Sequence, residues 1–124
     1  MIRLKTACAG ALALILTACQ TGPYGPPPGH SADPVYDWRV DRAGDLVVRV
    51  ASNGCTTRDS FVADVYGAGG QGWNFDVTLT RIHSDNCRAL LPQGVELVWS
   101  RDELGLPQGA GLRVTNPRSA PPSR

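Results

Sequence analysis

Three residues of metal-binding types alternate in the second half of the chain: His83, Asp85 and Cys87. In an extended strand, residues two apart lie on one face, so these side chains would point the same way. Imidazole, carboxylate and thiolate groups together suit zinc or copper. The competing interpretation pairs Cys87 with Cys55 in a disulfide, which leaves no thiolate for a metal. We favour the disulfide and expect neither a metal nor another cofactor.

The same stretch contains the residue types of a hydrolytic triad, in the order His83, Ser84 and Asp85. Triad members need only meet in space, so sequence alone does not exclude this arrangement. The nucleophile-elbow pattern G-x-S-x-G and the metalloprotease pattern H-E-x-x-H do not occur in the chain. The glycine-rich stretch 67–72 lacks the G-K-[ST] of a phosphate loop. We predict that the protein is not an enzyme.

Aromatic residues flank the glycine-rich stretch on both sides, Tyr66 before it and Trp73 after it. If both side chains are exposed and adjacent, they form an aromatic patch that a glycan or a peptide could contact. The sequence therefore gives Tyr66 and Trp73 as a candidate binding surface.

Arg81 continues the apolar phase of the residues before it. A buried arginine requires a partner, and Asp59 or Asp85, both near a cysteine, would serve as its carboxylate. We expect a structural ion pair beside the cysteines. The alternative is a bulge that turns Arg81 to solvent.

The elements that must position these residues have the period of β-strands. Short strands at near-regular spacing, separated by Gly- and Pro-rich turns, are typical of antiparallel sandwiches and small barrels. We predict an all-β fold, a small antiparallel sandwich or barrel of five to six strands with one disulfide. Apolar and polar residues alternate in segments 46–50, 61–66, 75–80, 95–100 and 112–115, and residues 38–40 add a shorter edge strand. The helix candidates are single turns at 85–91 and 102–104.

Length and charge exclude several classes of protein. The chain has 124 residues, which corresponds to one domain at most. A formal net charge of +1 gives no reason to expect a nucleic-acid partner.

The N-terminus has the pattern of an export signal. Arg3 and Lys5 precede the apolar run 7–16, which is too short to cross a bilayer as a helix. The run ends in Leu16-Thr17-Ala18-Cys19, which resembles the lipobox of bacterial lipoprotein precursors. In that family the thiol takes a diacylglycerol, the signal is cut before the cysteine, and the new amine is acylated.

The resemblance implies a signal peptide at residues 1–18 and lipidation of Cys19. Two or more acyl chains anchor a protein stably, so the expected location is a membrane outside the cytoplasm. By resemblance to enterobacterial sorting, Gln20 after the cysteine favours the outer membrane, with the protein facing the periplasm. The alternative is an ordinary signal peptide cut after Ala18, which leaves Cys19 as a free thiol.

The assignment of the cysteines then follows. Cys8 is lost with the signal and Cys19 is lipidated, so Cys55 and Cys87 remain for the folded part. An exported protein meets an oxidising environment, and we predict that these two form a disulfide.

The mature chain divides into three parts by composition. Residues 19–34 contain the lipidated cysteine and a Pro- and Gly-rich linker with a reach of roughly 40 Å. Residues 35–115 are the β domain, and residues 116–124 are expected to be a disordered tail.

The mature domain carries a second, weaker resemblance. The stretch NGCTTRDSF at 53–61, followed by Arg81, Asp85 and Cys87 and by ELGL at 103–106, is similar to a pattern in small uncharacterised proteobacterial envelope proteins. This resemblance supports the fold and supplies no activity.

We therefore expect a lipid-anchored envelope accessory module that binds or supports another envelope component. Its partners would be the membrane, through the N-terminal lipid, and an envelope protein or cell-wall component, with no nucleic acid. The second hypothesis is a small protein inhibitor of an envelope-directed hydrolase, a lysozyme or a protease. An inhibitor must project a rigid loop with one or two anchor side chains.

Overall fold

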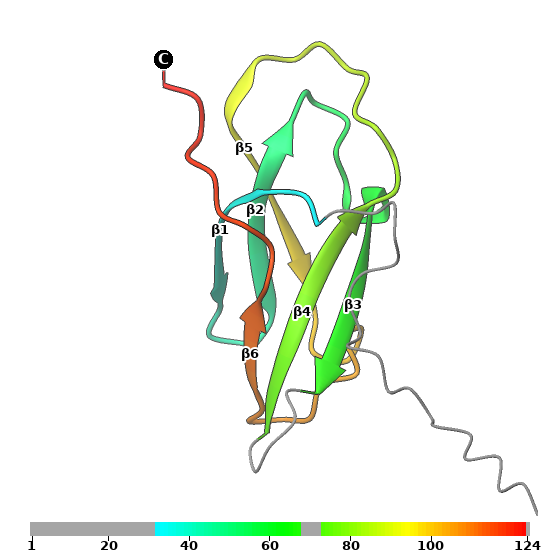
Figure 1. The fold of residues 1–124 in the computed structure, drawn as a ribbon, viewed down its shortest axis with the longest axis vertical. Coiled ribbons are helices and arrows are strands. Elements are labelled where there is room, and N and C mark those ends of the chain that lie inside the picture. The colour runs from blue at the N-terminus through cyan, green and yellow to red at the C-terminus, as the bar shows by residue number, and fades with distance from the viewer. Residues whose placement is uncertain (1–31, 68–72, 124) are drawn as a thin grey trace, which may run out of the picture.

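The computed structural model describes residues 32–67 and 73–123, and within them it forms two three-stranded sheets that lie face to face (Figure 1). The lipobox, Cys19 and most of the linker lie outside the described residues. One sheet has the order β1-β2-β5 and the other β3-β4-β6. The bounds are β1 Val35–Val40, β2 Leu46–Ser52, β3 Phe61–Gly67, β4 Asn74–Arg81, β5 Leu91–Trp99 and β6 Gly111–Val114. The predicted all-β sandwich is confirmed.

The core lies between the sheets and is built from the apolar phase that the sequence indicates for each strand. Side chains on one face of a strand recur every second residue, and here they point to the opposite sheet. The Phe61 ring packs edge-on against Trp99, with 6.5 Å between ring centroids. The largest fully buried side chains are Leu46, Leu79, Val35, Val48, Val50 and Val77.

A close approach between β2 and β5 requires a glycine. Gly94 has a φ of +68°, and a Cβ there would lie 2.0 Å from the carbonyl oxygen of Val50. The register between the strands shifts at this point, between Val50 and Ser52. A β-bulge of this kind bends the strand and increases its twist.

The last strand corrects the expectation of a wholly antiparallel fold. β6 pairs parallel to β4, from Asn74 opposite Gly111 to Val77 opposite Val114. β5 lies in the other sheet and runs back along the molecule, so the chain has reversed direction twice when it reaches β6. β6 therefore runs the same way as β4.

The folded body extends beyond Thr115, and the predicted tail boundary is wrong. Asn116 is buried, the backbone N–H of Val35 donates to the carbonyl of Pro117 at 2.9 Å, and Ser119 N–H donates to Val35 at 2.9 Å. Composition predicted disorder because the segment offers little apolar surface. Its order comes instead from hydrogen bonds to the first strand.

The predicted helical turn at 85–91 is also wrong. Residues 82–90 form a loop without regular structure, and β5 begins at Leu91. A 3-10 turn, η1 (Arg58–Ser60), is the one helical element among residues 32–67 and 73–123, and the sequence did not predict it. Among the described residues, no helix has the length and apolar character to span a bilayer.

Candidate functional site

The predicted disulfide between Cys55 and Cys87 is present, with 5.7 Å between the two Cα atoms. It joins the loop 53–57, which follows β2, to the loop 82–90, which connects β4 to β5. These two loops lie at one end of the sandwich, and the first and last described segments of the chain, 32–34 and 119–123, lie there too (Figure 1). We call this region the disulfide end.

The carboxylate of Asp85 holds both loops of the disulfide end in place. It accepts five hydrogen bonds, with donor–acceptor distances between 2.7 and 3.1 Å. These hydrogen bonds hold the pKa of Asp85 far below its usual range, and the bond from the Thr56 hydroxyl has the largest effect. The other donors are the Ser52 hydroxyl and the backbone N–H groups of Asn53, Cys55 and Cys87. Loop 82–90 is thus fixed by a covalent bond and by a hydrogen-bond cluster.

Arg81 does not form the predicted ion pair. Its guanidinium donates to the Thr56 hydroxyl at 3.2 Å and to the Ala51 carbonyl at 3.1 Å, and it lies 4.5 Å from the ring centroid of Phe61. Within the described residues it has no ion pair with Asp59, which is exposed, or with Asp85. The Thr56 hydroxyl stands between the charges, because it accepts from Arg81 and donates to Asp85.

The metal and triad arrangements gain no support from the geometry of loop 82–90. The candidate ligand atoms of Cys55, Asp85 and Cys87 lie within 4.8 Å of one another. However, both sulfurs are in the disulfide and the carboxylate already accepts five hydrogen bonds. His83 and Ser84 are exposed and lie outside this cluster.

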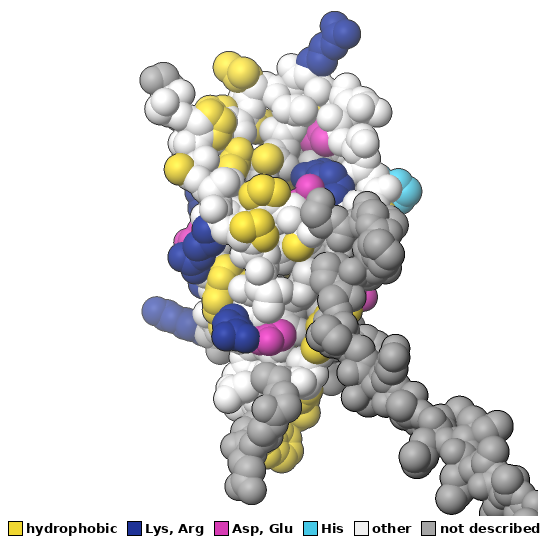
Figure 2. Space-filling model, viewed as in Figure 1, with side chains coloured by type: hydrophobic (Ala, Val, Ile, Leu, Met, Phe, Trp, Pro, Cys, Tyr) yellow, Lys and Arg dark blue, Asp and Glu magenta, His cyan; other side chains and the backbone are white. Residues whose placement is uncertain are grey.

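An apolar groove of about 690 Å³ lies beside loop 82–90. Ten residues line it and none is charged; Tyr36, Leu90, Leu91, Pro92 and Pro122 form most of its apolar wall. The Leu90 side chain is 93% exposed, the highest value among the exposed large hydrophobic residues of the described chain. Hydrophobic side chains gather on the upper half of the face in Figure 2. We call this surface the apolar groove.

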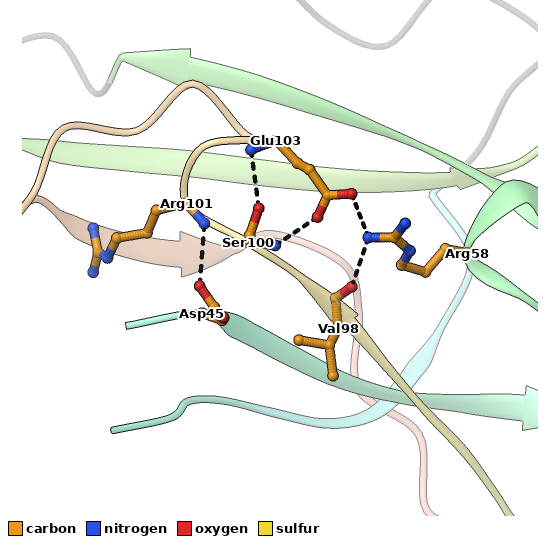
Figure 3. A network of polar contacts seen from close by, with 6 residues as sticks. All are labelled: Asp45, Arg58, Val98, Ser100, Arg101 and Glu103. Atoms are coloured by element: carbon orange, nitrogen blue, oxygen red, sulfur yellow. Dashed lines mark hydrogen bonds and ion pairs between the residues drawn. The ribbon is translucent and has the colours of Figure 1, made fainter. Parts of the chain in front are cut away.

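A second polar network ties η1 to the end of β5 (Figure 3). Arg58 donates to the carbonyl of Val98 at 3.2 Å and pairs with the Glu103 carboxylate. Glu103 also accepts from the backbone N–H of Ser100 at 2.8 Å, and this bond, followed by the one from Arg58, lowers the pKa of Glu103. The network braces the open side of the sandwich, where β3 and β5 are edge strands.

Tyr66 and Trp73 are both exposed, by 38% and 67%. They do not form one patch. Tyr66 pairs with Asp76 and follows the outward phase of β3, whereas Trp73 precedes β4 on the phase of Phe75, which packs against the core. No aromatic contact joins them in the part of the chain that the structure describes.

The sequence analysis missed two features of the disulfide end: the exposed side chain of Leu90, and the hydrogen bonds by which Asp85 joins the two loops. The signal for Leu90 is the sequence Leu90-Leu91-Pro92. Two adjacent leucines in an extended chain point to opposite sides, so one of them must face away from the core.

Comparison with protein-family models, with curated proteins and with solved structures gives no match.

Proposed function

We propose that the protein is a lipid-anchored envelope accessory module that binds or supports another envelope component, and that it is not an enzyme. The observation that carries the proposal is the rigid, uncharged apolar groove at the disulfide end. An apolar groove with few polar groups in its wall is a common form of binding site. The lipobox resemblance supplies the anchor and the compartment.

Rigidity matters to this proposal because binding by a preformed surface loses little conformational entropy. Loop 82–90 is held by the disulfide and by Asp85, and the backbone N–H of Ala89 donates to Asn53 at 2.8 Å. The side of the apolar groove that loop 82–90 forms is thus fixed by contacts within the chain.

One observation favours the second candidate function, inhibition of an envelope-directed hydrolase. Leu90 is a single apolar side chain that projects from a clamped loop, which is the arrangement of an anchor residue that fills a partner's pocket. Both candidate functions would use the apolar groove and Leu90, and they differ in the partner that binds there.

The test of the binding surface is a pull-down from detergent-solubilised envelope with the full mature chain. Leu90→Asp places a charge at the apolar groove. The control, Val40→Asp, places the same charge at an exposed valine at the far end of β1, away from the groove. We expect one stoichiometric component with the wild type and with Val40→Asp, and its loss with Leu90→Asp. Equal recovery by all three, or turnover of a substrate by the purified chain, would contradict the proposal. A hydrolase that the wild type inhibits would select the second candidate.

The lipid anchor has its own test. Cys19→Ala in the full chain should abolish incorporation of labelled palmitate and leave the product unprocessed or released from the membrane. Normal processing and membrane retention of this variant would refute lipidation at Cys19.

A further inference from the structure

The chain joins the folded body at the disulfide end. The Asp33 carboxylate accepts from the backbone N–H of Arg81 at 2.9 Å, and Asn116 donates to the Asp33 carbonyl at 2.8 Å. Residues 20–32 separate Asp33 from Cys19. A linker of this length reaches roughly 40 Å when extended. An acyl anchor on Cys19 would therefore keep this end of the sandwich within roughly 40 Å of the membrane, which lets it touch the bilayer.

The surface that this end presents is apolar and uncharged at its centre. The apolar groove contains no charged lining residue, and Leu90 projects beside it almost fully exposed. The end of the sandwich closest to the proposed anchor is thus the one that displays the most exposed apolar side chain.

The charged side chains of loop 82–90, Asp85 and Arg88, suit contact with an anionic surface. Asp85, the one acidic residue of loop 82–90, points inward, and its oxygens are occupied by hydrogen bonds. Arg88 is exposed and pairs with no carboxylate in the described part of the chain. It is two residues from Leu90, and an arginine side chain can reach a phosphate while its stem lies along apolar surface.

We propose that, while no envelope partner occupies the apolar groove, the disulfide end rests on the bilayer that carries the anchor, with Leu90 at the hydrocarbon border and Arg88 among the lipid phosphates. The inference rests on the proposed lipidation of Cys19. Transfer of one leucine side chain out of water favours an orientation by roughly tenfold to a hundredfold. That is too little to recruit a free protein, but it is enough to orient one that its acyl chains already confine.

The test places an environment-sensitive fluorophore on Leu90→Cys in the full lipidated protein, bound to vesicles of phosphatidylethanolamine and phosphatidylglycerol. In the mature chain the introduced cysteine is expected to be the one free thiol, because Cys19 is acylated and Cys55 is paired with Cys87. Val40→Cys, at the far end of β1, is the matched control. We expect a blue-shifted emission with several-fold higher intensity at position 90, quenched by brominated lipid, and no change at position 40.

A probe at position 90 that is as polar as the probe at position 40, on protein that sediments with the vesicles, would overturn the orientation and leave the anchor intact. Protein that does not sediment with the vesicles would refute the anchor, and this inference with it. Shielding of position 90 that requires added envelope protein would assign the surface to a protein partner and refute the lipid contact.

A second variant pair guards against loss of Leu90 in the labelled protein. Ala89 is also exposed, and a probe on Ala89→Cys leaves Leu90 in place. We expect a blue-shifted emission from this variant. Adding Leu90→Asp to it should abolish the shift. A shift that survives Leu90→Asp would count against insertion of this side chain. Mass spectrometry of the non-reduced protein confirms that the disulfide is intact in each variant.

Discussion

The Asn116 side chain joins three segments of the chain that are far apart in sequence. Its Oδ1 accepts from the backbone N–H of Leu79 at 2.8 Å, and its Nδ2 donates to the Leu79 carbonyl at 2.7 Å and to the Asp33 carbonyl at 2.8 Å. The residue is 6% exposed. Asn116 therefore continues the ladder of β4 beyond the point where β6 ends, and at the same time fixes the start of the folded body.

The substitution Asn116→Ala would remove these three hydrogen bonds and leave the N–H and C=O of Leu79 buried without partners. A buried polar group without a partner costs about 1–3 kcal/mol. We take the lower half of that range for each group, because the cavity left by the amide can admit water. The expected loss of unfolding free energy is then about 2–4 kcal/mol. For a domain of this size, that corresponds to a fall in Tm of roughly 10–25 °C.

The assay is thermal and urea unfolding, followed by circular dichroism, of residues 19–124 carrying Cys19→Ala, which lack the apolar run 7–16 and the thiol proposed to be acylated. The control is Asn86→Ala, the same change at an exposed asparagine whose side chain has no hydrogen bond within the described residues. A Tm for Asn116→Ala within about 2 °C of the control would refute the argument that this residue closes the fold.

Three further predictions concern stability. Replacement of both Cys55 and Cys87 by alanine opens a loop with a sequence separation of 32. Loop entropy then predicts a loss of about 3–4 kcal/mol of unfolding free energy, and an unchanged urea midpoint would contradict this. Hydrogen bonds, chiefly from Arg39, lower the pKa of Glu96 from its ordinary 4.5 to about 2, so its contribution to stability is complete above pH 4.5 and is lost as the pH falls toward 2. Glu96→Gln should therefore reduce the fall in urea midpoint between pH 5 and pH 2.5, and an equally steep fall would count against the pairing. Arg81→Met keeps an apolar contact with Phe61 but removes the two hydrogen bonds of the guanidinium. We expect the unfolding free energy to fall by about 1–2 kcal/mol. A Tm equal to that of the wild type would show that these bonds contribute nothing to stability.

Much of the fold could be predicted because side-chain alternation reports directly on burial. Leu46, Val48 and Val50 were assigned to the inner face by periodicity alone, and each is at most 1% exposed. The Cys55–Cys87 disulfide was predicted by elimination among four cysteines and is present. Both inferences depend on local or countable features of the chain.

What could not be predicted depends on which strand lies in which sheet. The parallel pairing of β6 requires that β5 belong to the opposite sheet, and periodicity says nothing of this. The order of segment 116–119 comes from backbone hydrogen bonds to Val35, a residue distant in sequence. A Pro-rich composition therefore indicated a tail where the structure has an ordered segment.

The candidate site shows the same limit. Asp85 was named as a partner for Arg81, and the two residues do share a neighbour in Thr56. Charge alone suggested a direct pair. The hydroxyls of Ser52 and Thr56 and three backbone N–H groups supply the carboxylate with its partners instead. The backbone donors cannot be recognised from the identity of any side chain.

The hydrogen bonds that Val35 donates to Pro117 and accepts from Ser119 join the first strand to the C-terminal segment of the body. A chain synthesised from its N-terminus onward can pair β1 with β2 early. The other edge of β1 can form its hydrogen bonds only after Pro117 and Ser119 have been synthesised. Folding is therefore completed late, as a single closure of distant segments, and such topologies fold slowly. A chain that ends at Thr115 lacks these bonds and those of Asn116 to Leu79 and Asp33, so we expect proteases to degrade it faster than the full chain.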